Sequence, residues 1–251
     1  MMKYTIIKNS DNPLYVGDSI TEGISGVNYV KYLESEFPNY IHINQGLGGD
    51  TLLGISNRLM SLLKHEDFNY IVFEAGHNDI IIPYFEEQDL LLKLAAKKLK
   101  YRGSIPTGIT EFKEVLEEKI IDIKALTNAN IIITTLSCIG ENMNTDLNKK
   151  RKIINQSIME IAKNHNYLLA DVGNAFNNIL NNIDSSNYVL GGLFKLMLHD
   201  PVYSRKVKWT EILSKRRNLS LTIDGVHINE AGAKIYAKKI SQTLRESPNF
   251  V

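Results

Sequence analysis

The chain has 251 residues, of which 43% are hydrophobic and 23% charged, a composition typical of a globular protein that can bury a full core. This composition excludes intrinsic disorder, collagen-like repetition and a coiled coil. Lys and Arg number 29 against 28 Asp and Glu, a formal net charge of +1, so no whole-chain field favours nucleic acid or an anionic membrane as a partner.

The single cysteine, Cys138, excludes an intrachain disulfide and a cysteine-rich zinc site, and it fits a reducing compartment. The apolar run 4–7 is too short for the core of a secretory signal. No run of about 18 apolar residues could span a bilayer. We therefore expect a cytoplasmic protein without a membrane span.

Short apolar runs alternate along the chain with longer amphipathic ones. The short runs are rich in β-branched and aromatic residues, as expected for strands buried on both faces, and they lie at 14–16, 40–43, 70–73, 131–135 and 167–170. Helical spacing of apolar residues follows at 30–37, 52–62, 112–123, 147–161 and 233–244. This alternation predicts five parallel strands with helices on both faces, and ligands bind such sheets outside the carboxyl ends of the strands.

Two stretches interrupt the alternation, at about 80–110 and 185–220. The first contains an extra helical segment, 86–100, opened by the apolar run 80–85. The second has no confident strand and two candidate helices, 189–198 and 209–215. Segments of this length inside a compact domain are usually lids or binding loops. Neither reads as a linker, so we expect one domain over 1–251, with a frayed C-terminal end at 248–251.

The first strand runs into Gly17-Asp18-Ser19. A serine just beyond the carboxyl end of a buried strand could be an exposed nucleophile. The tripeptide is equally good turn chemistry, in which Asp18 or Ser19 caps the following helix.

A glycine cluster, ending in Gly49-Asp50-Thr51, follows the second strand and precedes a helix. Free N–H groups at such a place favour negative charge. The P-loop pattern requires a lysine where Asp50 stands, and this acid would repel phosphate. A site for a smaller, transient oxyanion stays open.

Two further segments place polar side chains in the same region. Asn78 and Asp79 follow the third strand, where a carboxamide could donate a hydrogen bond to an oxyanion, although an Asn-Asp turn is the alternative. Asp224 and His227 stand three apart in a glycine-containing turn before the last helix. A carboxylate there could hold an imidazole, as in a Ser-His-Asp relay; a helix cap beside a structural histidine is the alternative.

Taken together in this order, the four segments resemble the SGNH/GDSL hydrolase superfamily of serine esterases and lipases. The matching blocks are 17–19, Gly49 with 50–51, 76–79 and 224–227. The resemblance implies a three-layer α/β/α fold with a flavodoxin-like five-stranded parallel sheet, carrying the two inserted segments.

The resemblance also implies a role for each site residue. Ser19 would attack an ester carbonyl and form an acyl-enzyme, His227 would remove the serine proton, and Asp224 would orient the imidazole. The N–H groups of Ser19 and Gly49 and the amide of Asn78 would bind the oxyanion. Asp18, Asp50 and Asp79 would support their loops. We expect neither a metal nor an organic cofactor.

The expected substrate is a small acyl ester, with carbohydrate O-acetyl, aryl and lipid esters all open. The runs 80–85 and 188–197 could wall the cleft or belong to the core. Basic residues in the second insert could attract an anionic group or form a solvated face; they are Arg205, Lys206, Lys208, Lys215, Arg216 and Arg217. Two alternatives use the same site: an acyltransferase, and a non-catalytic module that binds carbohydrate or lipid.

Overall fold

The computed structural model describes residues 12–183, 186–192, 202, 206–248 and 250. At its centre is a sheet formed by β1 (Pro13–Gly17), β2 (Ile43–Gly46), β3 (Tyr70–Phe73), β4 (Asn130–Thr134) and β5 (Leu168–Ala170). The strand order is β2-β1-β3-β4-β5, and every neighbouring pair is parallel. This is the flavodoxin-like order of doubly wound sheets, so the predicted fold class is confirmed.

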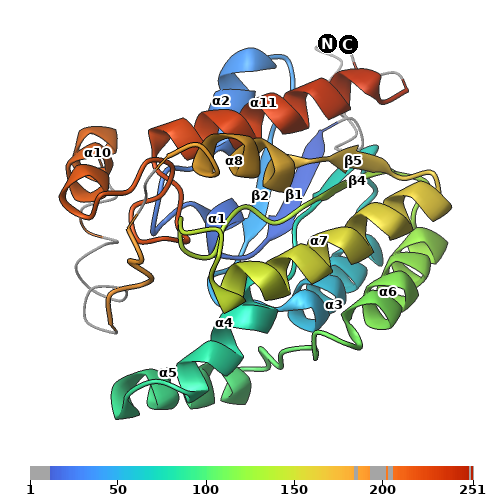
Figure 1. The fold of residues 1–251 in the computed structure, drawn as a ribbon. Helices are drawn as coiled ribbons and strands as arrows, with labels where there is room; N and C mark the ends of the chain where they lie inside the picture. Colours follow the sequence, from blue (N-terminus) through green and yellow to red (C-terminus); the bar gives the residue numbers. More distant parts are fainter. Residues whose placement is uncertain (1–11, 184–185, 193–201, 203–205, 249, 251) are drawn as a thin grey trace.

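Helices cover both faces of the sheet (Figure 1). One layer consists of α2 (Val30–Glu36), α8 (Val172–Leu180) and α11 (Glu230–Glu246), and the other of α3 (Leu52–Leu63), α6 (Phe112–Leu126) and α7 (Asp146–Asn164). Every residue of β1 and β3 is buried, as expected for strands packed between two helical layers. The core therefore lies on both sides of the central strands, and the carboxyl ends of the strands meet at one side of the molecule.

The second strand lies three residues further along the chain than predicted. The apolar run 40–43 indicated its position, but β2 spans Ile43–Gly46. Pairing with β1 decides the register, in which Ile43 lies opposite Leu14 and Gly46 opposite Gly17. Because β2 is at the edge of the sheet, it tolerates the polar residues 44–45. A strand prediction based on apolar runs therefore misses these two positions.

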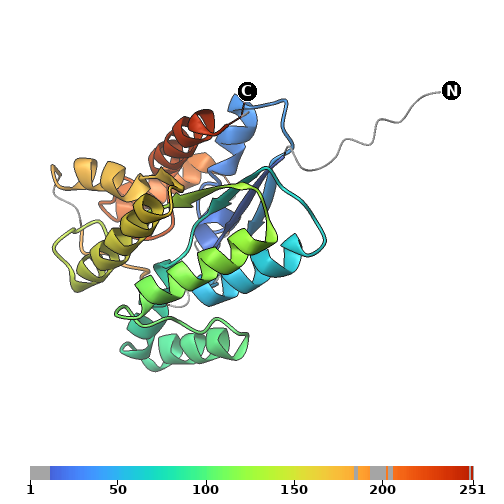
Figure 2. The same ribbon diagram turned by 90° about the vertical axis from the view of Figure 1, so that its right-hand side faces the viewer.

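The first insert forms two helices and not one. α4 (His77–Glu86) begins inside the Gly-His-Asn-Asp segment, and α5 (Leu90–Tyr101) follows after a short turn. Asp89 starts α5 by accepting hydrogen bonds from the N–H groups of Leu91 and Leu92, at 2.9 and 3.0 Å, so the helix cannot begin at 86 as predicted. Figure 2 shows this helical pair below the layered body.

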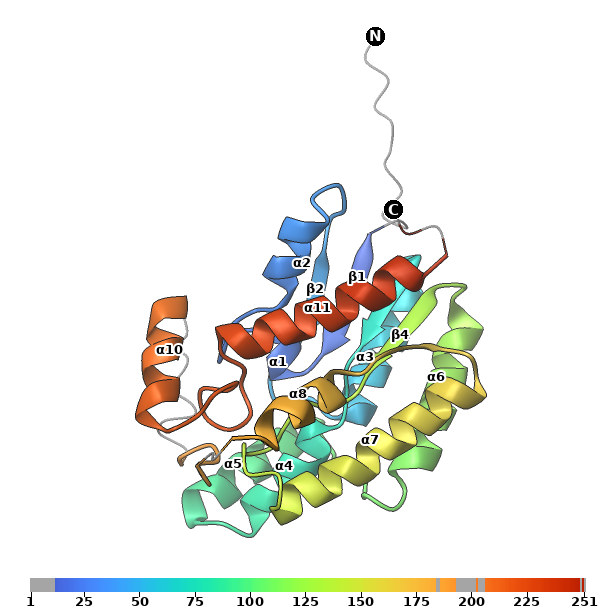
Figure 3. The same cartoon turned by 45° about the horizontal axis from the view of Figure 1, so that its top comes forward.

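The second insert contains α10 (Val207–Arg216), which confirms the helix expected at 209–215. This helix lies beside the start of α11 (Figure 3). Residues 189–192 of the expected helix 189–198 are not helical, and residues 193–198 lie outside the described ranges. α8 had no counterpart in the sequence analysis, although Val172, Phe176 and Leu180 give it an apolar stripe.

The C-terminal end departs from the expected frayed state. Phe250 is buried, and its ring lies 4.6 Å from that of Tyr40, 4.9 Å from that of Phe37 and 5.0 Å from that of Tyr70, measured between centroids. These aromatic residues stand at the amino ends of β2 and β3, on the side of the sheet opposite the expected site. Within the described ranges, none of the helices has the length and apolar character needed to cross a bilayer.

Candidate active site

Ser19 lies at the first position of the short helix α1 (Ser19–Glu22), directly beyond β1. Asp18 caps this helix, because its Oδ1 accepts a 2.9 Å hydrogen bond from the Ile20 N–H. Gly17 has no room for a side chain, since a Cβ there would lie 2.6 Å from Oε2 of Glu74. The helix-cap interpretation of Asp18 is therefore compatible with the interpretation of Ser19 as a nucleophile, because the cap fixes the position of Ser19.

The structure brings Ser19, His227 and Asp224 together in one hydrogen-bonded chain. His227 Nε2 lies 2.9 Å from Ser19 Oγ, and His227 Nδ1 lies 2.7 Å from Asp224 Oδ2. With the ring proton on Nδ1, Nε2 can accept the serine O–H. This arrangement spans the whole fold, because α1 follows the first strand and His227 precedes the last helix.

A tight turn holds the aspartate and the histidine of this chain. Gly225 has φ +92°, a conformation that favours glycine, and Oδ1 of Asp224 accepts from the N–H groups of Val226 at 3.0 Å and His227 at 2.8 Å. Burial alone would raise the pKa of Asp224, but the His227 ring and these N–H donors outweigh it and leave the pKa below its ordinary value. The carboxylate is thus charged where it holds the imidazole.

Three groups named as oxyanion donors line the same cavity. Gly49 has φ +82°, and within the described ranges neither its N–H nor that of Ser19 donates to another protein group. The Asn78 amide already donates to the Asp50 carbonyl at 2.9 Å and to Asp18 Oδ2 at 3.3 Å. The two backbone donors are therefore free, whereas the amide donor is shared.

Asp50 and Asp79 each tie loops together beneath the cavity. Asp50 Oδ2 accepts from Arg58 Nε at 3.0 Å. Asp79 accepts from the N–H groups of Leu52 at 3.0 Å and Thr107 at 2.7 Å, which joins the start of α3 to the end of the first insert. Burial raises the pKa of Asp79 to about 6 against the effect of these N–H donors.

A buried ionic cluster lies behind Ser19 and consists of Asp18, Glu74 and His77. His77 Nδ1 lies 2.9 Å from Glu74 Oε1 and 3.6 Å from Asp18 Oδ2, and Nε2 lies 3.2 Å from the Ser137 hydroxyl. Burial alone would lower the pKa of His77, but the two carboxylates raise it to about 9.

The imidazolium in this cluster therefore balances the buried charge of the carboxylates. The same three side chains have potential metal ligand atoms within 4.8 Å of one another, and a proton on His77 Nδ1, which the raised pKa favours, would compete with a metal ion for this position. Glu74 was missed in the sequence analysis, although an acid directly after a fully buried strand is a usable signal.

Glu141 is a second missed residue that supports the site. It is buried, and its carboxylate accepts hydrogen bonds from the N–H groups of Ser220, Leu221 and Thr222 and from the Thr222 hydroxyl, all at 2.7 or 2.8 Å. The segment that it holds leads directly into the turn with Asp224. No sequence pattern indicates this contact, because its partners are backbone groups about 80 positions away.

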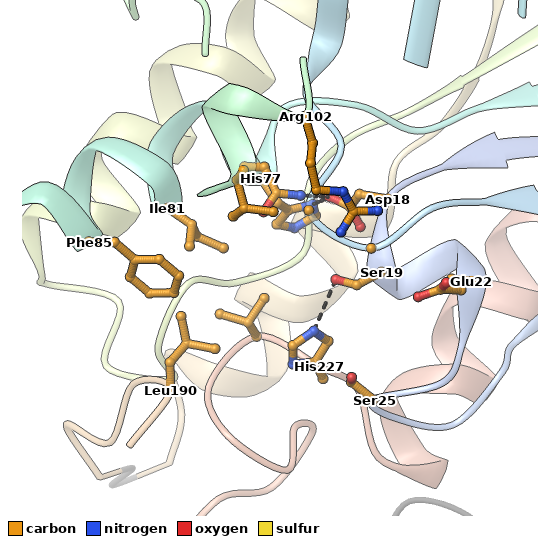
Figure 4. A pocket seen from close by; sticks show the side chains of 15 residues that line it. Asp18, Ser19, Glu22, Ser25, His77, Ile81, Phe85, Arg102, Leu190 and His227 are labelled. Atoms are coloured by element: carbon orange, nitrogen blue, oxygen red, sulfur yellow. Dashed lines mark hydrogen bonds and ion pairs between the residues drawn. The ribbon is translucent and has the colours of Figure 1, made fainter. Parts of the chain in front are cut away.

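The cavity has a volume of about 210 Å³ and two chemically different sides (Figure 4). Ile81, Phe85 and Leu190 form an apolar side, and Val226 also lines the cavity. Glu22 and Ser25 lie on the other side of Ser19, and Arg102 reaches in from the end of α5. The cavity thus offers separate surroundings to the two halves of a bound molecule.

The inserts contribute to this cavity in part. Ile81 and Phe85 of the run 80–85 line it and also belong to the core, whereas Ile80 and Ile82 belong to the core alone. From the run 188–197, Leu190 lines it, and 193–197 lie outside the described ranges. The basic residues of the second insert were expected to attract an anion, but those that the structure describes do not line the cavity. Arg205 lies outside the described ranges, and Arg217 donates to the Ile223 carbonyl at 2.6 Å.

Comparisons with known proteins agree with the fold. A family model described as the GDSL-like lipase/acylhydrolase family matches residues 15–235, whereas no curated protein matches the chain. A catalytic mutant of Axe2, an acetylxylan esterase from Geobacillus stearothermophilus, is 19% identical with a TM-score of 0.62 over 96% of each chain.

Two other solved structures are similar to the same extent. LAE5, an alpha/beta hydrolase enzyme from the metagenome of Lake Arreo, Spain, is 18% identical with a TM-score of 0.60 over 94% of this chain and 96% of that one. The acetyl xylan esterase AlAXEase is 17% identical with a TM-score of 0.57 over 92% and 98%. Because the family match spans most of the sequence, this chain belongs to the GDSL-like lipase/acylhydrolase family and is a carboxylic ester hydrolase.

Proposed function

We propose that the protein hydrolyses small acyl esters through an acyl-enzyme on Ser19. The observation that carries this proposal is the hydrogen-bonded chain from Asp224 through His227 to Ser19, with distances of 2.7 and 2.9 Å, which opens into the cavity. A serine hydroxyl is a weak nucleophile unless a base removes its proton, and Nε2 of His227 lies within reach of that proton.

In the first half of the reaction, Ser19 Oγ bonds to the ester carbonyl carbon while its proton passes to His227 Nε2. Asp224 stabilises the imidazolium. The oxyanion accepts from the N–H groups of Ser19 and Gly49, and Asn78 joins them by giving up its longer bond, the one to Asp18. The carbon–oxygen bond to the alcohol then breaks, and the alcohol leaves with the proton from His227.

In the second half, water attacks the acyl-enzyme. His227 takes one proton from this water, the oxyanion forms again at the same donors, and the acid leaves as the bond to Ser19 Oγ breaks and the serine regains its proton. Each oxyanion donor typically stabilises such a transition state by about 3 to 4 kcal/mol. His227 Nε2 carries every proton that moves in this scheme, first from Ser19 to the alcohol and then from water to Ser19.

The shape of the cavity supports a small acyl group. A volume of about 210 Å³ is below the range typical of drug-sized ligand sites. The apolar side suits an acyl chain, and the side with Glu22 and Ser25 suits a polar alcohol. Acetyl esters of carbohydrates fit this division, and the similarity to esterases named for acetylxylan favours testing them before aryl and lipid esters.

A fluorophosphonate probe tests the nucleophile directly. We expect mass spectrometry to locate one adduct on Ser19, and Ser19→Ala to lose both the adduct and the hydrolysis of 4-nitrophenyl acetate by at least about 10³-fold. Ser35→Ala is the matched control, because it removes the same hydroxyl from an exposed serine of α2 outside the cavity. Full activity in Ser19→Ala, or an adduct on another residue, would disprove the assignment.

The fate of the acyl group separates hydrolysis from transfer. With 4-nitrophenyl acetate and an added alcohol, we expect free acetate to be the main product. Predominant formation of the new ester would assign an acyltransferase, and saturable carbohydrate binding without any probe adduct would assign a binding module.

A further inference from the structure

The end of α5 is fixed against the glycine loop of the active site. Arg102 terminates this helix, and its N–H donates to the carbonyls of Leu99 at 3.0 Å and Lys98 at 3.2 Å. One turn earlier, Leu99 packs on Gly49 so closely that a Cβ at Gly49 would lie 2.5 Å from Leu99 Cδ2. The backbone of Arg102 is therefore held next to the oxyanion loop.

The chain that leaves α5 is also tied to the catalytic framework. Thr51, beside the glycine loop, donates its hydroxyl to the Ile105 carbonyl at 2.9 Å. The Thr107 N–H donates to Asp79, the neighbour of Asn78, at 2.7 Å. Because hydrogen bonds hold the chain both before and after Arg102, the backbone of Arg102 has a defined position above the cavity.

The guanidinium of Arg102 points into the cavity toward Ser19 (Figure 4). Among the described residues it has neither a hydrogen-bond acceptor nor an ion-pair partner. The acids that line the cavity are engaged elsewhere: Asp18 caps α1, and Glu22 accepts from the Gly48 N–H. Within the described part of the chain, Arg102 is thus an exposed arginine without a counterion that faces Ser19.

We propose that Arg102 binds an anionic group, a carboxylate or a phosphate, on the alcohol part of the ester. A planar guanidinium can donate two parallel hydrogen bonds to either group. The alcohol part is the one concerned, because the acyl chain is assigned to the apolar side formed by Ile81, Phe85 and Leu190. This inference rests on the proposed hydrolysis at Ser19 and adds the charge of the substrate to it.

The lysines of α5 near Arg102 also favour an anionic ligand. Lys93, Lys97 and Lys98 are exposed on α5 and make this part of the molecule basic, although the chain as a whole carries a formal charge of only +1. A local positive field draws anions toward the cavity and is screened by salt. Selectivity for an anionic ester should therefore weaken as the ionic strength rises.

Matched substrates test the proposal. We would measure kcat/KM for 3-acetoxybenzoate, for 3-acetoxyphenyl phosphate, and for the neutral methyl ester of 3-acetoxybenzoate, in the wild type and in Arg102→Gln. The anionic-to-neutral ratio is compared between the two proteins, so the intrinsic reactivity of each ester cancels. We expect this ratio to fall by about fivefold in Arg102→Gln, as for one charge-assisted pair at an exposed side chain.

Further variants and substrates sharpen the result. We expect Arg102→Glu to lower the ratio further and to favour the cationic ester 3-acetoxy-N,N,N-trimethylanilinium. Lys97→Gln removes the same charge from the same helix outside the cavity, and it should leave the ratio within about twofold of the wild type. For 4-nitrophenyl hemisuccinate, whose anion is on the acyl part, we expect Arg102→Gln to have no selective effect. The carboxylate and phosphate arms show which anion is preferred.

The outcomes distinguish this inference from the proposed function. If the wild type hydrolyses the neutral ester and Arg102→Gln leaves the ratio unchanged, the role of Arg102 is wrong while the esterase proposal stands. An effect of Arg102→Gln that is confined to the hemisuccinate, or an equal effect from Lys97→Gln, would also overturn it. If no ester is hydrolysed and Ser19 is not labelled, the proposed function itself fails.

Discussion

Single side chains in the active site depend on the atoms that orient them. In the proposed mechanism His227 works as a base only when its proton is on Nδ1, and the Asp224 carboxylate sets this because it can only accept there. The two backbone N–H groups on Oδ1 hold the carboxylate in place. The triad is therefore an ordered set of donors and acceptors, and a change of one atom should disrupt it.

Asp224→Asn changes one such atom. The Oδ1 acceptor for the two N–H groups would remain, but an amide NH₂ would face Nδ1 and drive the ring proton to Nε2, which could no longer accept from Ser19. We expect kcat for 4-nitrophenyl acetate to fall by about 10³ to 10⁴-fold, with the fold intact by circular dichroism. Asp146→Asn, which changes an exposed acid, is the control; a kcat for Asp224→Asn within twofold of the wild type would contradict the role assigned to Asp224.

The residues proposed to carry this chemistry could be named from the sequence, whereas several of the residues that support them could not. Ser19, Asn78, Asp224 and His227 stand in short blocks whose residue types are informative. Arg102 is one more basic residue in a lysine-rich segment, and only its place at the end of α5 directs it into the cavity. Its contribution follows from how the insert packs, which no local pattern records.

At the scale of elements, α1 is a single turn held at both ends by buried charge. Asp18 caps its start, and Glu74 Oε2 accepts from the Thr21 hydroxyl at 3.0 Å. The other carboxylate oxygen of Glu74, Oε1, lies 2.9 Å from Nδ1 of His77, the first residue of α4. A four-residue helix has little stability of its own, so this cluster is what fixes Ser19 against the sheet.

The cluster makes a prediction about pH. The pKa of His77 is raised to about 9 from its ordinary 6.5, so its contribution to folding is complete below pH 6.5 and is lost as the pH rises through 9. By linkage this amounts to about 3 kcal/mol. We expect chemical denaturation to show this decline in the wild type and not in His77→Gln.

Glu74→Gln provides the cross-check, because removal of the facing carboxylate should also flatten the stability profile. The groups that face the ring are Asp18, Glu74 and the Ser137 hydroxyl. If His77→Gln retained the wild-type decline between pH 6.5 and 9, the imidazolium would not be its source.

The elements themselves were predictable where burial alone decides them. β1, β3 and β4 lie between two helical layers, so their apolar runs are continuous and their positions were found to within two residues. β2 is polar because it pairs on one side only, and α5 begins where Asp89 caps it. In both of these elements a partner or a cap outweighs the apolar pattern.

At the scale of the whole molecule, contacts between distant segments bring Ser19, Asp224 and His227 together. Ser19 follows the first strand, and His227 precedes the last helix. Glu141, which follows β4, ties the C-terminal segment to the sheet because it binds the segment 220–222 that leads to Asp224. The geometry proposed for catalysis therefore forms only when the C-terminal segment docks on the sheet.

Glu141→Gln tests this docking. The amide would place an NH₂ group against donors that require an acceptor, so we expect a loss of about 3 kcal/mol in the free energy of unfolding. We also expect kcat to fall at least tenfold while KM for 4-nitrophenyl acetate stays within about threefold, because His227 shifts and the cavity wall does not. Glu118→Gln, an exposed change, controls for the loss of charge; unchanged stability and kcat in Glu141→Gln would refute this role.

The aromatic socket around Phe250 lies on the side of the sheet opposite Ser19. Phe250 completes the packing of Phe37, Tyr40 and Tyr70, so a chain shortened by these last positions would present three ring faces to water and invite aggregation. Substitutions that raise stability can therefore concentrate on this socket, and substitutions that change substrate preference on α4 and α5. Because the two regions lie on opposite sides of the sheet, neither set need disturb the other.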